Sequence, residues 1–396
     1  MSDANMQRSR RTMRQWLRRV AGIGLLVLIG LAVPVGLCEA FLWLFKPIKF
    51  HEWMVWIPDG RIRARAQPGQ VFETADGSVV RINRLGFRGP DYAWTPPPGT
   101  LRLVAFGGSS TFCYHNHGDE NTWPGRLQAI LSERLTMPVE VINLGLPGFD
   151  STQSKTNYMF LGRCLHPHVV LQYDSWNDMK YFRSLEKGAH VMAFTVGLPN
   201  KPFWQQWARA TQIGRYARNA YWNWQKRRLQ PAFANLEREG EPANRPVPPA
   251  VFDWARRNFE DFAMLARADG VLPVQISQGS IVHPTTRQIP RGEEELAFAA
   301  TMFDMSFPVL YQTVLEMNRI VEESAARHGA IFVDGYNLVP HDFEHYQDDV
   351  HFTDKGCDVF ARGVAEALLK DARFMALAER ARAGGSAGAP ADRPAG

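Results

Sequence analysis

Cysteine is scarce in this chain, and its cysteines stand far apart in the sequence. The 396 residues include four cysteines, at positions 38, 113, 164 and 357, with no CxxC pair among them. Thiolate metal centres draw their ligands from closely spaced cysteines and histidines. The sequence therefore gives no expectation of a metal site.

The chain also lacks the long basic stripe that a nucleic-acid backbone requires. Its formal net charge is +5, but much of that charge comes from six arginines within the first nineteen residues, namely Arg8, Arg10, Arg11, Arg14, Arg18 and Arg19. The remaining acidic and basic residues are mixed and nearly balanced. We therefore expect no nucleic-acid partner. An internal repeat is absent as well.

An uncharged run follows those arginines. Ala21 to Cys38 comprises eighteen residues, and at about 1.5 Å per residue a helix of that length spans roughly 27 Å, enough to cross a hydrocarbon core. Trp43 and Lys46 suit the membrane interface. Arginines before the run and few after it predict a cytoplasmic N-terminus (1–20), a single-pass anchor (21–45) in the cell (inner) membrane and an extracytoplasmic, periplasmic remainder.

A cleaved signal peptide is the alternative interpretation of the same run. Its best small-x-small cleavage site is Cys38-Glu39-Ala40, which is a poor one, and the apolar run is long for this role. A lipidated cysteine would need a small residue before it, whereas Leu37 precedes Cys38. We therefore expect an anchor that is not cleaved.

Short segments separated by turn residues occupy 46–98. The run Ser78 to Asn83 and the turn pairs Asp59-Gly60 and Asp76-Gly77 predict small β-hairpins. The stretch WTPPPGT (94–100) predicts a stiff linker. This part is expected to be a membrane-proximal, β-rich segment.

From residue 99 the pattern changes to apolar runs that alternate with amphipathic stretches. Five runs predict strands: LRLVAFGG (101–108), VEVINLG (139–145), HVVLQYDS (168–175), VLPVQIS (271–277) and AIFVDGY (330–336). Continuous apolar strands separated by helices are typical of a parallel sheet covered on both faces. We expect an α/β domain over 99–375 and a disordered Gly/Ala/Pro-rich tail over 376–396.

A largely helical, aromatic-rich insertion is expected at about 181–268. It suits a lid, a glycan-stacking platform, or helices that bury their rings against the domain. Its aromatic residues include Trp204, Trp207, Tyr216, Tyr221, Trp222 and Trp224.

Chemically active residues follow the predicted strands. Ligands bind at the carboxyl ends of the strands in open α/β sheets. The first strand leads into FGGSST (106–111), the second into NLGLPG (143–148), the third into SWND (175–178), and DDVH (348–351) follows the fifth. A hydroxyl, a carboxylate and an imidazole thus reach one edge of the sheet, beside an amide side chain. These are the parts of a serine-nucleophile acyl-transfer site.

The four blocks resemble those of the SGNH (GDSL-type) hydrolase family, and of its membrane-anchored bacterial-type members in particular. The resemblance covers about residues 101–370, without the insertion. It implies a three-layer α/β/α fold with a flavodoxin-like sheet of about five parallel strands, and ester or acyl-glycan chemistry without a cofactor. It also implies Ser109, Asp348 and His351 as the catalytic triad, and Ser109, Gly148 and Asn177 as the oxyanion hole.

Two residues depart from the family pattern. Gly108 stands where many members have aspartate, although a membrane-tethered subset also has glycine there. Trp176 stands where a small residue usually precedes the asparagine. As a substrate-binding residue, Trp176 would narrow the pocket or stack on a sugar ring.

The residue types suit these roles without the family. A serine hydroxyl needs a base to take its proton, and a carboxylate three residues before His351 can orient that base. Losing one oxyanion donor typically costs about 3 kcal/mol in the transition state. Other roles remain open: Ser109 or Asn177 can cap a helix, Gly145 and Gly148 can be ordinary turn residues, and Asp349 can replace Asp348. We expect the remaining nearby histidines at the surface or rim, namely His115, His117, His341 and His345.

The sequence thus predicts a membrane-anchored extracytoplasmic serine esterase that removes acyl groups, acetyl above all, from a cell-envelope or extracellular glycan. An O-acyltransferase of polysaccharide modification would use the same site, and a catalytically silent glycan-binding or scaffold subunit is the third possibility. Cys113 and Cys357 follow Ser109 and His351 closely. A fold that joins the latter two would bring the thiols together, and a disulfide is permitted in an oxidising compartment.

Overall fold

The computed structural model describes residues 3–46, 56–59, 63–73, 78–185, 211–217, 220, 221, 224 and 242–384. It divides into one unit of residues 1–50 and 199–225 and another of residues 51–198 and 226–396. Much of the expected insertion, with Trp204, Trp207 and Trp222, lies outside the described residues, as does the turn pair at 76–77.

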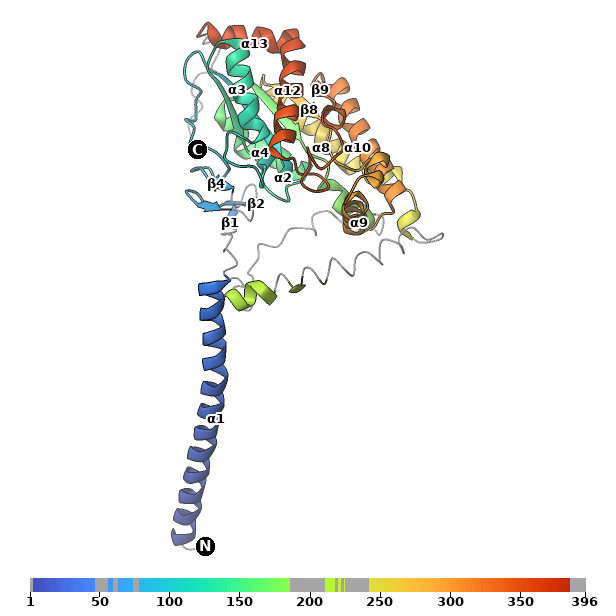
Figure 1. Ribbon diagram of the computed structural model, residues 1–396. Coiled ribbons are helices and arrows are strands. Elements are labelled where there is room, and N and C mark those ends of the chain that lie inside the picture. Colours follow the sequence, from blue (N-terminus) through green and yellow to red (C-terminus); the bar gives the residue numbers. More distant parts are fainter. Residues whose placement is uncertain are drawn as a thin grey trace. The chain divides into compact units, whose positions relative to one another are not determined.

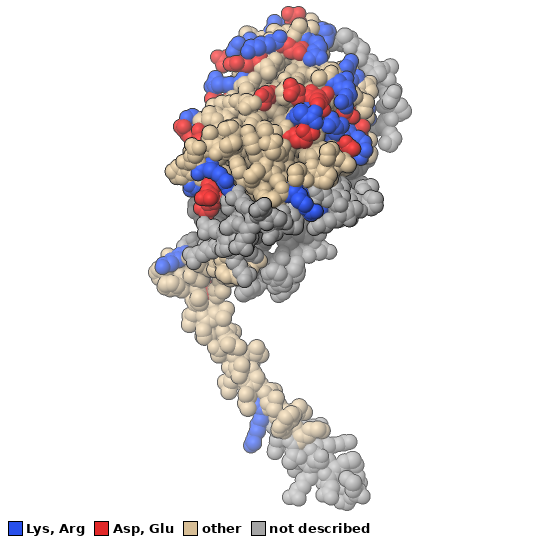
Figure 2. All heavy atoms as spheres, turned by 90° about the vertical axis from the view of Figure 1, so that its right-hand side faces the viewer, with Lys and Arg blue, Asp and Glu red and all other residues tan. Residues whose placement is uncertain are grey.

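The first unit contains one long helix, α1 (Asp3–Phe45). Its segment Trp16–Phe45 has a mean hydropathy of 2.5 and no buried residues, so by length and composition it can cross a membrane, as a signal sequence also could. Figure 2 shows mostly uncharged atoms along this helix, whereas both signs of charge are interspersed over the second unit. Residues 212–217, also helical, belong to the same unit as α1.

The second unit begins with the predicted hairpins. Strand β1 (Trp56–Asp59) pairs with β2 (Arg63–Ala66), and β3 (Val71–Glu73) pairs with β4 (Val79–Arg81), both antiparallel. An isolated antiparallel bridge between Ile82 and Arg88 follows β4. The hairpins are short, and the chain then runs through the proline-rich stretch to the main sheet.

All five predicted strands are present in a single parallel sheet (Figure 1). They are β5 (Leu101–Gly107), β6 (Val139–Asn143), β7 (Val169–Tyr173), β8 (Leu272–Ile276) and β9 (Ile331–Val333), in the order β6-β5-β7-β8-β9. This is the flavodoxin-like order, in which the first strand lies beside both the second and the third. Leu103 pairs with Val141 and Val169, so the carboxyl ends of these strands meet at one edge.

Helices cover both faces of the sheet, which confirms the three-layer α/β/α fold. Alternate residues of β5 point to opposite faces: Leu103 and Ala105 pack in one hydrophobic cluster, Val104 and Phe106 in another. The first face is covered by α3 (Trp123–Leu135), α12 (Asp354–Lys370) and α13 (Ala372–Arg382), and the second by α4 (Ser151–Phe160), α8 (Pro249–Ala268) and α10 (Phe307–His328).

The end of the expected insertion belongs to this layered core. Residues 249–268 form α8, which packs on the sheet and contributes the fully buried Phe259 and Phe262. The shorter elements are α2 (Ser109–Phe112), η1 (Gly162–Leu165), η2 (Asp178–Tyr181), α5 (Phe182–Leu185), η4 (Pro242–Asn244), η5 (Pro284–Gln288), α9 (Gly292–Phe303) and α11 (Gly335–Leu338).

The expectation of a disordered tail from residue 376 is wrong for its first part. Residues 376–382 complete α13, because Ala378 and Ala381 are buried against the core and Arg382 donates to the Leu135 carbonyl. The small residues that suggested a tail, GGSAGAPADRPAG (384–396), follow this helix. Residues 385–396 lie outside the described part of the chain.

Candidate active site

Three loops meet at the carboxyl edge of the sheet. Strand β5 ends at Gly107, and α2 begins two residues later at Ser109. The loop after β6 is joined to this turn, since the Leu146 N–H donates to the Gly107 carbonyl over 3.0 Å. The hydroxyl of Ser110 donates to the Val350 carbonyl over 3.4 Å, which ties the third loop, 347–351, to the same turn.

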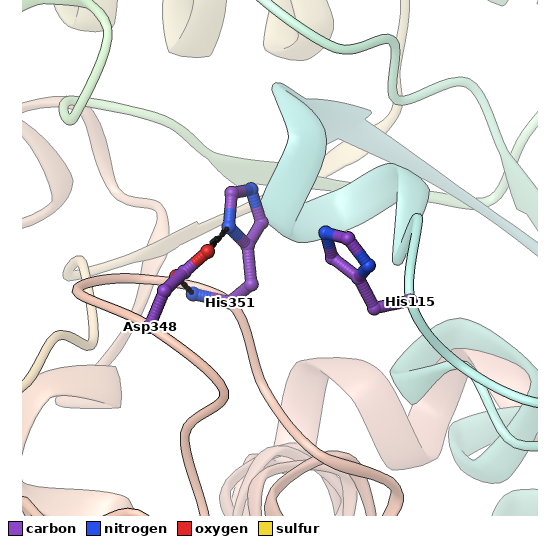
Figure 3. A group of neighbouring side chains, drawn as sticks. All are labelled: His115, Asp348 and His351. Carbon is purple, nitrogen blue, oxygen red and sulfur yellow. Dashed lines mark hydrogen bonds and ion pairs between the residues drawn. The ribbon is translucent and has the colours of Figure 1, made fainter. Parts of the chain in front are cut away.

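The structure brings Ser109, His351 and Asp348 into one hydrogen-bonded chain. His351 Nε2 lies 2.7 Å from Ser109 Oγ. On the other side of the ring, Nδ1 lies 2.7 and 2.9 Å from the two carboxylate oxygens of Asp348, as Figure 3 shows. Asp348 also accepts the N–H groups of Val350 and His351, so the carboxylate is fixed by its own loop.

Electrostatics couple the two charged members of this chain. Burial alone would lower the pKa of His351, but the charge and hydrogen bond of Asp348 raise it to about 8. Burial alone would raise the pKa of Asp348, but His351 and two backbone N–H groups hold it well below its usual range. Asp348 is therefore ionised near neutral pH and can stabilise an imidazolium.

The alternative roles left open by the sequence differ from this geometry. Ser109 is the first residue of α2, whose N-cap is Gly108, so the serine hydroxyl does not cap the helix. Asn177 stands at the N-cap of η2, but its side chain makes no capping bond. Asp349 is buried, and burial together with the charge of Asp348 raises the pKa of Asp349 well above its usual range. Asp348, not Asp349, contacts the imidazole.

The amide of Asn177 lies directly over Gly108. Its Nδ2 donates to the Phe149 carbonyl over 2.7 Å, and its Oδ1 accepts from Lys180 Nζ over 2.5 Å. A Cβ at position 108 would stand 2.6 Å from that Nδ2 and 2.9 Å from the Phe149 oxygen. Only glycine admits this approach, which accounts for the missing aspartate. The amide nitrogen keeps a second hydrogen beside the Ser109 turn.

Gly148 lies in the loop that carries Phe149. Its φ of +84° is in the left-handed region that favours glycine. Gly148 thus acts as a turn residue, which is the alternative role that the sequence left open. A direct approach of the Gly148 N–H to Ser109 stays a prediction.

A small recess opens beside Ser109. Its size allows about one water molecule. Trp176 lines it, but the indole is only 6% exposed. It packs edge-on against the ring of Phe303, with the two ring centroids 5.0 Å apart. The geometry favours a narrowing role for Trp176 over stacking on a sugar. The lining residues are Gly108, Ser109, Ser110, Phe149, Tyr173, Asp174, Ser175, Trp176, Asn177 and Gln278.

Three buried carboxyl groups lie at or near this recess: Asp174 lines it, and Asp150 and Asp178 are the other two. Asp174 accepts from Ser154 Oγ over 3.0 Å, and Asp178 accepts from the hydroxyl of Ser151. Burial raises the pKa of Asp174 to about 7, and raises those of Asp150 and Asp178 as well. The hydrogen bonds from Ser151 and Ser154 to these carboxyl groups join α4 to the loop that carries Asn177.

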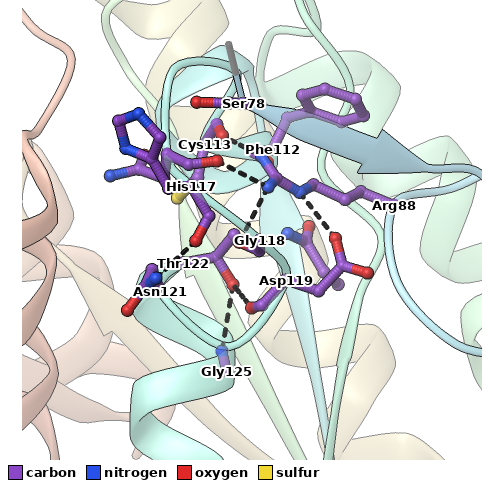
Figure 4. A network of polar contacts seen from close by, with 12 residues as sticks. Ser78, Arg88, Phe112, Cys113, His117, Gly118, Asp119, Asn121, Thr122 and Gly125 are labelled. Atoms are coloured by element: carbon purple, nitrogen blue, oxygen red, sulfur yellow. Dashed lines mark hydrogen bonds and ion pairs between the residues drawn. The ribbon is translucent and has the colours of Figure 1, made fainter. Parts of the chain in front are cut away.

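Sequence reasoning missed the support of the loop that follows the nucleophile. Arg88, only 1% exposed, donates to the carbonyls of Asn116 and Gly118 and to the Asp119 carboxylate, each over 2.9 Å. It also donates to the carbonyls of Phe112 and Cys113 (Figure 4). No local pattern announces this contact, because Arg88 belongs to the β-rich segment.

His115, on the same loop, was expected at the surface or rim but lies against His351. Its ring meets that of His351 edge to face at 5.8 Å (Figure 3). Its carbonyl accepts from Ser78 Oγ over 3.3 Å and from Gln347 Nε2 over 3.2 Å. His115 thus connects the β-rich segment with the histidine loop.

Metal and disulfide chemistry can be judged from the same residues. The ligand-capable atoms of His115, Asp348 and His351 lie within 4.8 Å of one another. Both ring nitrogens of His351 already have partners, so a metal bound to this ring would have to displace Ser109 or Asp348. Cys113 and Cys357 are buried, with their Sγ atoms 3.9 Å apart and not bonded as a disulfide.

No protein-family model and no curated protein matches this chain. Among solved structures it is similar to an acetylxylan esterase from Geobacillus stearothermophilus, at 13% identity, covering 67% of this chain and 93% of that one, with a TM-score of 0.40. It is also similar to a GDSL-like lipase from Parabacteroides merdae, at 11% identity, 67% and 94% coverage, and a TM-score of 0.40. A lipolytic protein of the G-D-S-L family from Desulfitobacterium hafniense shares 11% identity, with 67% and 99% coverage and a TM-score of 0.38.

Proposed function

We propose that this chain is a serine esterase of the SGNH type, anchored in the cell membrane with its catalytic unit outside the cytoplasm. The observation that carries the proposal is the hydrogen-bonded chain from Ser109 through His351 to Asp348, with 2.7 Å at each step. The order of the four sequence blocks and their places at the ends of parallel strands support it. The apolar helix Trp16–Phe45 supports the anchor.

The first half-reaction follows from this geometry. Ser109 Oγ attacks the ester carbonyl carbon while its proton passes to His351 Nε2, and Asp348 stabilises the imidazolium. The carbonyl oxygen becomes an oxyanion. Donors beside the turn can receive it: the N–H of Ser109 at the start of α2, the amide of Asn177 and, as proposed from the sequence, the N–H of Gly148. The C–O bond then breaks, and the leaving alcohol takes the proton from His351.

The second half-reaction reverses these roles. A water molecule gives a proton to His351 Nε2 and attacks the acyl carbon on Ser109. When the second tetrahedral intermediate collapses, the carboxylic acid leaves and Ser109 Oγ regains the proton. If a sugar hydroxyl attacks in place of water, the same steps transfer the acyl group and the enzyme is an O-acyltransferase.

The recess suggests the substrate class. Because it admits a group about as large as one water molecule, we propose acetyl as the acyl group. The alcohol side opens toward solvent from the edge of the sheet and suits an acylated glycan of the cell envelope or the extracellular space. Trp176 would set the limit on acyl length.

Comparing wild type with Ser109→Ala on p-nitrophenyl acetate tests the proposal. We expect the rate to fall by about 10³-fold or more in Ser109→Ala. Ser132→Ala, at a partly buried position of α3, is the matched control and should keep its activity. Equal rates for wild type and Ser109→Ala would instead support a catalytically silent subunit. Acylated sugar as the main product, with an oligosaccharide present, would support the O-acyltransferase.

A further inference from the structure

Glu39 has an unusual place in the apolar helix of the first unit. It is the one acidic residue between Trp16 and Phe45, and it directly follows the uncharged run Ala21–Cys38. That run spans roughly 27 Å, close to the thickness of a hydrocarbon core. In a membrane-spanning α1, the carboxylate of Glu39 therefore lies where the hydrocarbon ends and the headgroups begin.

The partners of Glu39 come from a segment far along the chain. One carboxylate oxygen accepts the Gln212 N–H over 2.5 Å, and the other accepts the Ile213 N–H over 2.9 Å. These N–H groups begin the helical residues 212–217, so they have no acceptor within that helix and carry partial positive charge. Because both N–H groups donate to this carboxylate, the first turn of the segment lies at the depth of Glu39.

A second set of contacts fixes the orientation of the segment. The hydroxyl of Tyr216 donates to the Lys46 carbonyl over 2.9 Å, and the Arg215 guanidinium lies 5.7 Å from the centre of the Trp43 ring. Arg215 is only 6% exposed. Both contacts are made with residues that follow Glu39, where Trp43 and Lys46 are typical of the membrane interface. The segment is thus held at headgroup depth over its whole first part.

Aromatic rings remain exposed on this segment. Tyr216, Tyr221 and Trp224 are 38%, 51% and 48% exposed, and the rings of Tyr221 and Trp224 lie 6.0 Å apart. Tyrosine and tryptophan are enriched where a bilayer meets water, because one part of each ring system is apolar and another is polar. The sequence continues with Lys226, Arg227 and Arg228, which suit anionic headgroups.

We propose that the described residues of this segment (211–217, 220, 221 and 224) form a second membrane contact at the bilayer surface, with Tyr216, Tyr221 and Trp224 at the boundary between headgroups and acyl chains. The partner is a phospholipid bilayer. This gives part of the expected aromatic insertion a function other than a lid or a glycan platform. The inference rests on the proposed anchor, since Glu39 is placed at the interface by a spanning α1.

The native cysteines allow a direct test in the full chain. Cys38 and Cys164 are exposed, whereas Cys113 and Cys357 are buried. An environment-sensitive NBD label is attached at Cys38 (in Cys164→Ser), at Cys164 (in Cys38→Ser), or at residue 220 (in Ala220→Cys with both serine substitutions). Ala220 is exposed and lies beside Tyr221, so the rings themselves stay unchanged. Each protein is reconstituted into phosphatidylethanolamine–phosphatidylglycerol vesicles with or without a spin-labelled lipid.

The inference predicts that the spin-labelled lipid quenches the label at residue 220 at least about two-fold more than the label at Cys164, and that its emission is blue-shifted. Adding Glu39→Ala should reduce the quenching at residue 220 and leave that at Cys38 unchanged. Quenching at Cys38 with none at residue 220 would overturn the inference and keep the anchor. No quenching at Cys38 would overturn the anchor.

Discussion

At the scale of single residues, two opposing effects set the pKa of His351. Burial lowers the pKa of this imidazole, and Asp348 raises it to about 8. A base can take the serine proton only in its neutral form. The charge that holds the ring in place therefore also delays its activation until the pH approaches that pKa.

The pH profile should show this effect. The kcat/KM for p-nitrophenyl acetate should rise with pH, with a midpoint near the raised pKa of His351, and then level off. In Asp348→Asn the raising charge is lost, so the midpoint should move to lower pH, while the plateau falls by about 10⁴-fold. Rates are corrected with Ser109→Ala at each pH. An unchanged midpoint in Asp348→Asn would mean that another group titrates.

Gly108 provides a second prediction at this scale. A methyl group at this position meets Asn177 Nδ2 and the Phe149 carbonyl within 3.0 Å, so Gly108→Ala should displace the amide. We expect Gly108→Ala and Asn177→Ala each to lower kcat by about 10²-fold.

A double-mutant cycle separates this mechanism from general damage. If both substitutions act through the same amide, the double variant should be little worse than either single one. Additive losses, or a large loss of thermal stability in Gly108→Ala alone, would contradict the account.

At the scale of helices and strands, the sequence predicted a strand correctly wherever a continuous apolar run is buried on both faces of the sheet. All five strands of the sheet were predicted for that reason. The sequence blocks that follow these strands predicted that Ser109, Asp348 and His351 meet at one edge of the sheet, where the structure shows them in one hydrogen-bonded chain. Residues 249–268, expected as the helical end of the insertion, form α8 and bury Phe259 and Phe262 against the sheet, which is one of the interpretations that the sequence left open. The tail was predicted to begin too early, since residues 376–382 belong to α13. Arg88 and His115 were missed because their contacts depend on packing between distant segments.

Substitution of Arg88 tests whether the β-rich segment (46–98) supports catalysis. Its donors hold five groups of the loop 112–119, and the ammonium of a lysine cannot reproduce that fork. Arg88→Lys should therefore lower the free energy of unfolding by about 3 kcal/mol. It should also reduce kcat by a larger factor than it changes KM.

Arg84→Lys is the matched control, because Arg84 in the same segment has a side chain 75% exposed and pairs only with Asp91 among the described ion pairs. Its kcat and melting temperature should stay close to those of wild type. If Arg88→Lys behaves like Arg84→Lys, the loop does not depend on this guanidinium.

At the scale of the whole molecule, one chain joins an apolar helix long enough to cross a membrane with the unit that contains Ser109, His351 and Asp348. With Trp16–Phe45 as an anchor, the protein should stay with membranes through high-salt and alkaline extraction and be released only by detergent. Its intact mass should include the N-terminal arginines. A mature protein that begins near Phe41 would show cleavage of a signal peptide instead.

The central claim is that Ser109 is a nucleophile activated by His351. Reaction of the intact protein with a fluorophosphonate, followed by mass spectrometry of its peptides, measures this directly. The account predicts one covalent adduct on Ser109, formed far more slowly in His351→Ala and absent in Ser109→Ala. An unmodified Ser109 in folded wild-type protein, or equally fast labelling without the imidazole, would contradict it.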